Sequence, residues 1–298
     1  MLLKELLPSL KTYLYSMGRL NLGPWWNYDN VNSPFTRIIY LPSGEAEITI
    51  DGSKCHVKSG DMILVPPFIP ADYHCPEKAD HYYAIFRAEL AQGLELFSLP
   101  EISRHVVPAS DYAWCFERLL KLNSNIALEA LDPRDQAYNE QIWRAGPTNE
   151  SRSSRDLLET DGLLRLLLSA FIKTSKKAVM KNDSSVARLI RILTYIENNL
   201  DKSITLEDMA KEISLHPTYF SDLFVKQMGE RPISYLTRAR VGKAQILLAT
   251  TDKPVKDIAW ELGFKDVNYF HRVFKKRLRL SPGQWRKHFA RHNTSQDL

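Results

Sequence analysis

The chain has 298 residues, 44% of them hydrophobic, and a formal net charge of +5 at neutral pH, enough for two ordinary globular domains. No stretch approaches the roughly 20 consecutive apolar residues of a membrane-spanning helix, so we expect no membrane partner. The charge is unevenly divided, because residues 186–298 carry 20 Lys and Arg against 12 Asp and Glu, whereas residues 1–185 carry 20 against 23. A basic C-terminal third favours a polyanionic partner.

The N-terminal residues and the cysteines bear on location. The start, MLLKELLPSLKTYLYSMG, lacks the basic region, apolar run and small-residue cleavage site of a secretion signal. Cys55, Cys75 and Cys115 form no CxxC pair and are odd in number, which suits reduced thiols. Both features predict a cytoplasmic protein.

From about Phe35 to Val107 the sequence predicts a β domain. Short runs rich in β-branched and aromatic residues alternate with the turn signals PSG, DGSK and KSGD. EITIDGSKCHVKSGDMILVP indicates two strands around Asp51 and Gly52, then a turn into a third strand. This rhythm predicts a small antiparallel sheet, sandwich or barrel.

From Asp111 onward the periodicity becomes helical. DYAWCFERLLKL and RDLLETDGLLRLLLSAFIK place apolar residues three and four apart. The second has enough leucine to bury one face, either on the sheet or on a second copy of the chain. KTSKKAVMKNDSS (Lys173–Ser185) has the composition of a linker. We therefore expect an N-terminal domain over residues 1–181 and a C-terminal domain over residues 182–298.

The C-terminal third contains an internal near-repeat. YFSDLFVKQMGERP (Tyr219–Pro232) and YFHRVFKKRLRLSP (Tyr269–Pro282) align at an offset of 50 residues. Each follows a short helical segment with an alanine, LEDMAKEI or VKDIAWEL. Each copy therefore predicts a helix, a tight turn and an amphipathic helix that ends before proline. This order is typical of helix–turn–helix units, here two in tandem joined by the helical strut ISYLTRARVGKAQILLAT.

Individual residues of the second unit support this prediction. Gly263 fills the turn, where we expect a positive φ, and Asp266 is the expected N-cap of the following helix. Phe270 and Phe274, one turn apart, are expected to fill the core of the unit. Two recognition helices held by the strut would enter successive major-groove faces about 34 Å apart on one side of a duplex.

Residues 186–291 resemble the DNA-binding region of the AraC/XylS family of bacterial transcription regulators. The most family-typical pieces are Arg240, Ala244, Leu247 and Leu248 in the strut, DIAWELGF, NYFHRVFKK and SPGQWR. Residues 1–181 resemble the variable half of that family through the rhythm of GEAEITIDGSKCHVKSGDMILVPPFIPADY. The resemblance implies an α+β protein of two domains, in which a cupin-like antiparallel β-barrel with flanking helices precedes an all-α tandem helix–turn–helix region.

The resemblance also implies a function. It implies a sequence-specific regulator that binds double-stranded promoter DNA, forms a homodimer, needs no cofactor, and meets RNA polymerase and a small effector such as a carbohydrate. Arg279 departs from the family, which usually has Gly after the second recognition helix, and a positive φ at a non-Gly residue costs about 1 kcal/mol. His216 stands at the first N-cap in place of the common Ser, which should weaken that cap.

Polar side chains on the two recognition helices are the candidate DNA contacts. In the second unit, Asn268 suits adenine, Arg272 suits guanine and Val267 suits a thymine methyl group, while the lysines further along suit phosphates. The set is His216, Thr218, Ser221, Asp222 and Lys226 in the first unit and Val267, Asn268, His271, Arg272, Lys275 and Lys276 in the second. A solvated surface group is the alternative for each residue.

The segment GPWWNYDN supplies candidate effector contacts in the N-terminal half. Trp25, Trp26 and Tyr28 offer flat faces on which a sugar ring can stack, and Arg37 can bind hydroxyls or an acid group. Packing in the mouth of a barrel or in a dimer seam is the alternative for these aromatic residues.

Two other functions stay open at this point. A cupin-type metalloenzyme with a DNA-binding appendage would need a metal site, yet His56, His74 and His81 occur singly, without an HxH pair or a correctly spaced Glu. We therefore predict no metal and no catalytic residue. A ligand-independent architectural DNA-binding protein is the other alternative, and it would show little sequence discrimination.

Overall fold

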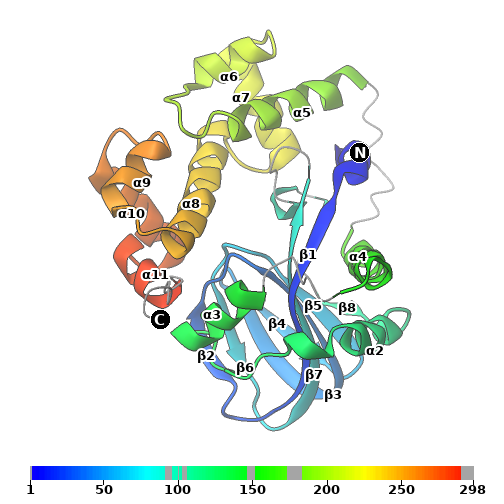
Figure 1. The fold of residues 1–298 in the computed structure, drawn as a ribbon. Helices are drawn as coiled ribbons and strands as arrows, with labels where there is room; N and C mark the ends of the chain where they lie inside the picture. Colours follow the sequence, from blue (N-terminus) through cyan, green and yellow to red (C-terminus); the bar gives the residue numbers. More distant parts are fainter. Residues whose placement is uncertain are drawn as a thin grey trace.

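The computed structural model describes residues 2–90, 96–99, 101–102, 106–145, 152–172 and 183–289. It places an N-terminal β domain beside a C-terminal helical region (Figure 1). The domain boundary predicted at residues 181/182 lies outside the described residues. Within the described ranges, no helix is both long enough and apolar enough to cross a membrane.

The described residues form an antiparallel sheet of eight strands. Its two halves share one long strand, β3 (Thr36–Ile50). One half has the order β1 (Lys11–Leu22), β7 (Ala79–Glu89), β3, β5 (Asp61–Val65) and β8 (Val107–Pro108). In the other half, β4 (Ser53–Lys58) and β6 (Ala71–His74) pair with β3, and β2 (Asn27–Val31) pairs with β6. Both halves contribute side chains to one apolar core. The predicted antiparallel β domain is confirmed, including the hairpin at Asp51 and Gly52, which both have positive φ.

Helices cover the sheet and the N-terminal end of the chain. They are α1 (Leu2–Leu6), α2 (Ala113–Leu122), α3 (Gln136–Ala145) and α4 (Ser154–Ser169), the second and fourth of which were expected from the apolar spacing. The periodicity did not indicate α3. Helix α4 packs on β1 and α2 through Leu163, Leu164, Leu167 and Leu168.

The C-terminal region is entirely helical where it is described. It contains α5 (Asp183–Glu197), α6 (Leu206–Glu212), α7 (Pro217–Met228), α8 (Pro232–Thr250), α9 (Val255–Glu261), α10 (Val267–Leu278) and α11 (Pro282–Phe289). The pairs α6–α7 and α9–α10 are the two predicted helix–turn–helix units, and α8 is the predicted strut. Its 19 residues span about 28 Å at 1.5 Å per residue.

The helical region and the β domain share their apolar interior. Tyr138 and Trp143 of α3 belong to the same buried cluster as Phe274 of α10 and Trp285 of α11, and Figure 1 shows α3 beside α11. The buried side chain of Asn32 adds a polar contact, because its Nδ2 donates to the carbonyl oxygen of Leu278 at 3.0 Å. The second helix–turn–helix unit is therefore packed directly on the β domain.

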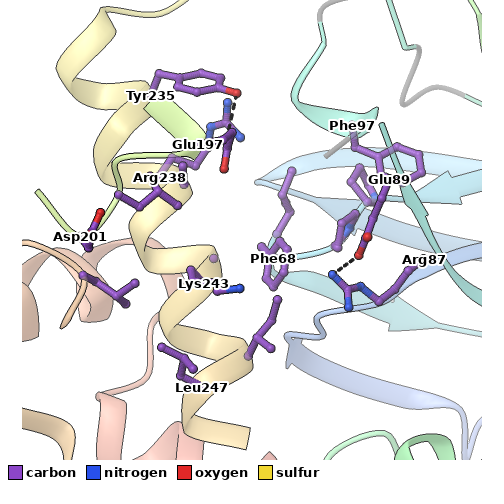
Figure 2. Close-up of a pocket in the computed structure, with 18 of the residues that line it drawn as sticks. Phe68, Arg87, Glu89, Phe97, Glu197, Asp201, Tyr235, Arg238, Lys243 and Leu247 are labelled. Atoms are coloured by element: carbon purple, nitrogen blue, oxygen red, sulfur yellow. Dashed lines mark hydrogen bonds and ion pairs between the residues drawn. The ribbon is translucent and has the colours of Figure 1, made fainter. Parts of the chain in front are cut away.

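A cavity of about 600 Å³ separates the β domain from α8 on the side of the first unit (Figure 2). Phe68, whose φ is +63°, reaches across it to Gly242 of α8. Arg87 and Glu89 form an ion pair on the β-domain side. On the helical side, burial raises the pKa of the Glu197 carboxyl to about 7, and the Tyr235 hydroxyl donates to that carboxyl at 3.4 Å. Because acidic and basic side chains both line this cavity, it favours neither anions nor cations.

Candidate DNA-binding surface and effector cavity

Local capping fixes the ends of the second recognition helix, α10. The Asp266 side chain accepts a hydrogen bond from the backbone N–H of Asn268 at 2.8 Å, which confirms the predicted N-cap. Arg279 ends the helix with a φ of +60°, and its N–H donates to the Lys275 carbonyl oxygen at 2.8 Å. The predicted positive φ is therefore confirmed at Arg279, as it is at Gly263, whose φ is +69°.

The outer face of α10 carries most of the predicted contact residues. Phe270 and Phe274 are completely buried, as predicted, which turns the opposite face of the helix toward solvent. The exposed residues of that face are Asn268, His271, Arg272, Lys275 and Lys276. Val267 is half-buried at the start of the helix. The arrangement presents base-reading and phosphate-binding side chains together, while the role of each residue in contacting DNA stays a prediction.

The first recognition helix, α7, presents a smaller polar face. His216 is its N-cap and makes no side-chain capping bond, in agreement with the weak cap expected there. Thr218, Asp222 and Lys226 are exposed. Asp222 lies 3.6 Å from Arg231, so that part of the face is not simply acidic.

The structure corrects one residue of the predicted face of α7. Ser221 is only 6% exposed, and its hydroxyl accepts a hydrogen bond from Nη1 of Arg231 at 2.9 Å. It lies one turn before buried Phe224 and is therefore on the inner side of the helix. The prediction that Ser221 belongs to the exposed contact face is wrong.

Two exposed tyrosines on the recognition helices were missed as candidate contacts. Tyr219 is 60% exposed and Tyr269 is 43% exposed. In the sequence they occupy equivalent positions in the two copies of the repeat. Consecutive residues on a helix point about 100° apart, so when the Phe of each YF pair lies at the centre of the buried face, the Tyr beside it lies at or beyond the edge of that face. That spacing was the signal available in the sequence.

Arg240 of α8 connects the two helix–turn–helix units. Its Nε donates to the Leu200 carbonyl oxygen at 2.9 Å, and its Nη2 donates to the Lys202 carbonyl oxygen. The same guanidinium lies 5.6 Å from the ring centroid of Phe264 in the second unit. The turn residue Gly263 also lies against this group, because a Cβ there would be 2.6 Å from Nη2. These contacts hold the turn at Gly263 against the loop before α6. They therefore fix the orientation of the second helix–turn–helix unit relative to the first.

A smaller cavity lies inside the β domain and holds about 50 Å³ of free space. Aromatic and polar side chains from four strands, the turn before β2 and α3 line it, namely Trp26, Tyr28, Arg37, Tyr73, His81, Tyr83 and Tyr138. The structure thus brings together three of the four predicted effector contacts. The fourth, Trp25, is 46% exposed and does not line the cavity, because adjacent side chains in this segment point in different directions. Trp25 therefore lies apart from the other three residues, and its contact with an effector stays a prediction.

The electrostatics of this β-domain cavity are set by one arginine and one neutral histidine. The Arg37 side chain is buried, and its Nη2 donates to the Tyr138 hydroxyl at 3.5 Å. His81 is also buried, with Nδ1 3.2 Å from the Leu20 carbonyl oxygen. Burial lowers the pKa of His81 to about 4, so the ring is neutral at physiological pH.

The histidine makes a pH-dependent prediction for the β domain. Since the pKa of His81 is about 4 when folded and about 6.5 when unfolded, the unfolded chain binds more protons between these values. The contribution of His81 to stability should therefore fall on acidification through this range, by up to about 1.4 kcal/mol per pH unit. Glu197, whose pKa is raised to about 7, acts in the opposite direction, so the test is the difference between variants. Urea unfolding at pH 7 and pH 5 measures the loss. His81→Gln should reduce it, whereas His56→Gln, at an exposed histidine, should not; equal losses in all three proteins would contradict the assignment.

The histidines that the structure describes lie in different surroundings. His56 is exposed and lies 3.2 Å from Glu45, whereas His81 is buried and lines the cavity. Among the residues that the structure describes, no group of three His, Cys, Asp or Glu is arranged to hold a metal ion.

Comparison with known proteins gives these features a family context. Residues 15–168 match the family model of an AraC-like ligand binding domain, and residues 209–288 match that of a helix-turn-helix domain. The lactose operon transcription activator of Staphylococcus xylosus is 31% identical over 152 residues, which are 51% of this chain and 54% of that protein. The arabinose operon regulatory protein of Salmonella typhimurium is 33% identical over 247 residues, which are 82% of this chain and 80% of that protein.

A solved structure matches the fold over almost the whole chain. ToxT from Vibrio cholerae is 12% identical, with 94% of this chain and 99% of that chain covered at a TM-score of 0.52. At this identity the likeness concerns the fold alone. Membership of a family is shown instead by the two family models and by the regulators matched by sequence. The chain belongs to the AraC/XylS family of DNA-binding transcriptional regulators and has an N-terminal ligand-binding domain.

Proposed function

We propose that the chain acts as a dimer that reads promoter DNA with α7 and α10 and changes its DNA affinity when a small effector enters the β-domain cavity. The main support for the proposal is that α7 and α10 each expose a polar face, and that α8 and Arg240 fix the position of these two helices relative to one another. The division at residues 181/182 is part of the proposal, and the two family matches, to residues 15–168 and 209–288, lie on either side of it.

The length of the strut supports simultaneous binding of both recognition helices. Helix α8 spans about 28 Å, close to the 34 Å repeat of the major groove. In this reading, Asn268 and Arg272 contact base edges, Val267 contacts a thymine methyl group, and Lys275 and Lys276 contact phosphates. His271, His216, Thr218, Asp222 and Lys226 complete the proposed surface. The exposed rings of Tyr219 and Tyr269 add apolar surface at the start of each helix.

Arg272 and Lys276 test the proposed DNA contacts as a pair. Arg272→Ala should weaken binding to the preferred site by about 1–3 kcal/mol and relax selection at one base position, because a bidentate contact to guanine is lost. Lys276→Ala should weaken binding to all sequences alike and lower the salt slope by about one unit. Affinities for specific and scrambled duplexes at several salt concentrations separate the two effects. An equal loss on both duplexes for Arg272→Ala would move this residue to the phosphate-binding group.

The relatives and the cavity support a carbohydrate-like effector. Two relatives are named for the lactose and arabinose operons, and the cavity offers the aromatic rings of Trp26 and Tyr28 beside polar groups. Its free space of about 50 Å³ holds a few water molecules, so a sugar must displace part of the wall. Binding should raise the thermal midpoint of the full chain.

Helix α3 provides the proposed connection from effector to DNA. Tyr138 lines the cavity, while Ile142 and Trp143 on the same helix belong to the buried cluster that contains Trp285 of α11. Just before α3, Arg134 lies 5.0 Å from the ring centroid of Tyr28. An effector that displaces Tyr138 would therefore shift a helix on which the second helix–turn–helix unit rests.

Exposed leucines on α4 support a homodimer. Leu158 is 75% exposed, and Leu157 and Leu166 are 42% and 38% exposed. These side chains lie on the face of α4 that does not pack on the sheet. Leu158→Glu should convert a dimer to a monomer in sedimentation or light-scattering measurements, because burying an unpaired charge at an interface is unfavourable. Ile233 is an aliphatic residue of α8 that is 43% exposed, like Leu157 of α4. Ile233→Glu should therefore leave the dimer intact. Loss of the dimer in both variants, or in neither, would contradict the α4 interface.

Regulation of transcription would follow from contact of the DNA-bound dimer with RNA polymerase. We assign no catalytic residue and no cofactor. The family membership and the relatives named as operon regulators support a regulator rather than a metalloenzyme.

A further inference from the structure

We propose that the effector of the β-domain cavity is a monosaccharide-sized molecule that carries one carboxylate, which binds to Arg37. The inference rests on the proposed effector role of this cavity and names the chemical class of the ligand. Three observations support it: the buried positive charge without an acidic partner, the polar groups around it, and the size of the free space.

The first observation is the isolation of the Arg37 charge. Arg37 lies on β3, opposite Ile85 of β7 and Val65 of β5, so both strand neighbours are apolar. Its side chain is only 6% exposed, and arginine remains charged under all ordinary conditions. No Asp or Glu lines the cavity among the residues described. A buried cation is most stable beside a negative charge, so an anionic group is the natural ligand for Arg37.

The tyrosines beside Arg37 do not supply the missing negative charge. Burial raises the pKa of Tyr73 to about 12, so its ring stays neutral. The Tyr138 hydroxyl accepts a hydrogen bond from Arg37 at a long 3.5 Å, and the neutral Tyr73 hydroxyl lies beside the same guanidinium. A guanidinium has five N–H donors, and two neutral hydroxyl groups leave most of these donors available to a ligand.

Other polar groups in the cavity suit the hydroxyl groups of a sugar acid. The buried Tyr73 hydroxyl lies next to the Arg37 guanidinium and has no other hydrogen-bond partner within the described residues. His81 is neutral and directs Nδ1 to a backbone carbonyl oxygen, which only accepts, so Nδ1 carries the proton and Nε2 is the acceptor. The cavity therefore offers an imidazole acceptor, tyrosine hydroxyl groups and one cation beside the ring of Trp26.

Charge and size select among anions. A carboxylate is planar, matches the fork of the guanidinium, and carries one charge that balances one arginine. A phosphate group near neutral pH carries up to two charges, one of which would stay uncompensated in this cavity. The free space of about 50 Å³ requires displacement of the α3 side even for a single ring, which disfavours a disaccharide.

Matched sugars test the charge directly on the full-length protein. Galacturonate and galactose, and likewise glucuronate and glucose, differ only in the carboxylate. Calorimetric titration should show at least about tenfold tighter binding of one acid than of its neutral partner. Inorganic phosphate and glucose 6-phosphate should bind more weakly than that acid. A neutral sugar that binds as tightly as its acid would overturn the carboxylate while leaving an effector cavity in place. Binding of none of these sugars and acids would count against both.

Variants of Arg37 separate the role of the charge from a general loss of fit. Arg37→Gln should reduce the ratio of acid to neutral affinity to about one, and its thermal midpoint without ligand should be equal to or higher than that of the natural protein. Arg37→Lys should retain part of the preference because it retains the charge. Tyr73→Phe should weaken acid and neutral sugar together and keep their ratio. A preference for the acid that survives in Arg37→Gln would overturn the proposal.

Discussion

Replacing Gly263 by Ala should destabilise the helical region by about 2–4 kcal/mol, because it combines an unfavourable backbone conformation with a steric clash. The φ of Gly263 is +69°, and a Cβ would lie 2.6 Å from Nη2 of Arg240 and 2.9 Å from the carbonyl oxygens of Leu200 and Lys202. Relief of the clash would break the contacts that Arg240 makes between the two units. DNA affinity should therefore fall together with the urea midpoint.

Two matched positions separate the backbone cost from the clash. Gly229 ends α7 with a φ of +76°, and nothing lies within 4 Å of a Cβ there, so Gly229→Ala should cost only about 1–2 kcal/mol. Arg279→Gly should stabilise the protein by about 1 kcal/mol, since Arg279 already holds a φ of +60°. Equal losses from Gly263→Ala and Gly229→Ala would show that the Arg240 contacts do not constrain the turn.

Replacing Trp285 by Ala should have the larger effect, about 3–5 kcal/mol, the range for deletion of a buried aromatic side chain. Trp285 is fully buried, and its Nε1 donates to the Gln245 carbonyl oxygen at 3.1 Å. Its ring centroid lies 6.2 Å from that of Phe274, within the cluster that also contains Trp143 of α3. The substitution should therefore loosen the second unit internally and detach it from the β domain.

Trp260 provides the control for Trp285. It is 51% exposed on α9, where Lys256 lies over its ring, so Trp260→Ala should change stability by no more than about 1 kcal/mol. Chemical unfolding followed by circular dichroism measures both variants. If the two substitutions cost the same, the packing of α11 between the second unit and the β domain is not a major source of stability.

The helix–turn–helix units were predictable because their information is local and repeated. The 50-residue offset, the turn at Gly263 and the cap at Asp266 each depend on residues a few positions apart, and all three agree with the structure. Ser221 was misplaced because it lies at the edge of the inner face of α7. Whether such a residue is exposed depends on Arg231 at the start of the next helix, which helical periodicity does not report.

The β-domain cavity was only partly predictable because its wall is assembled by strand pairing. Arg37, Tyr73 and His81 come from three strands, and α3, which contributes Tyr138, carries no clear sequence signal. The aromatic segment pointed to residues that line this cavity, but not to which of Trp25 and Trp26 points inward. That choice is made by the pairing of β2 with β6, because Asn27 and Tyr28 pair with His74 and Tyr73.

Selection of binding sites from a random pool of duplex DNA tests the central claim most directly. Two recognition helices held by α8 should enrich one sequence per chain with two conserved blocks, centred about 10 base pairs apart on one face of the duplex. Protection of the same bases in a footprint would join the selected sequence to the two helices. A pool without enrichment, or a site with a single block, would contradict DNA reading by both helix–turn–helix units.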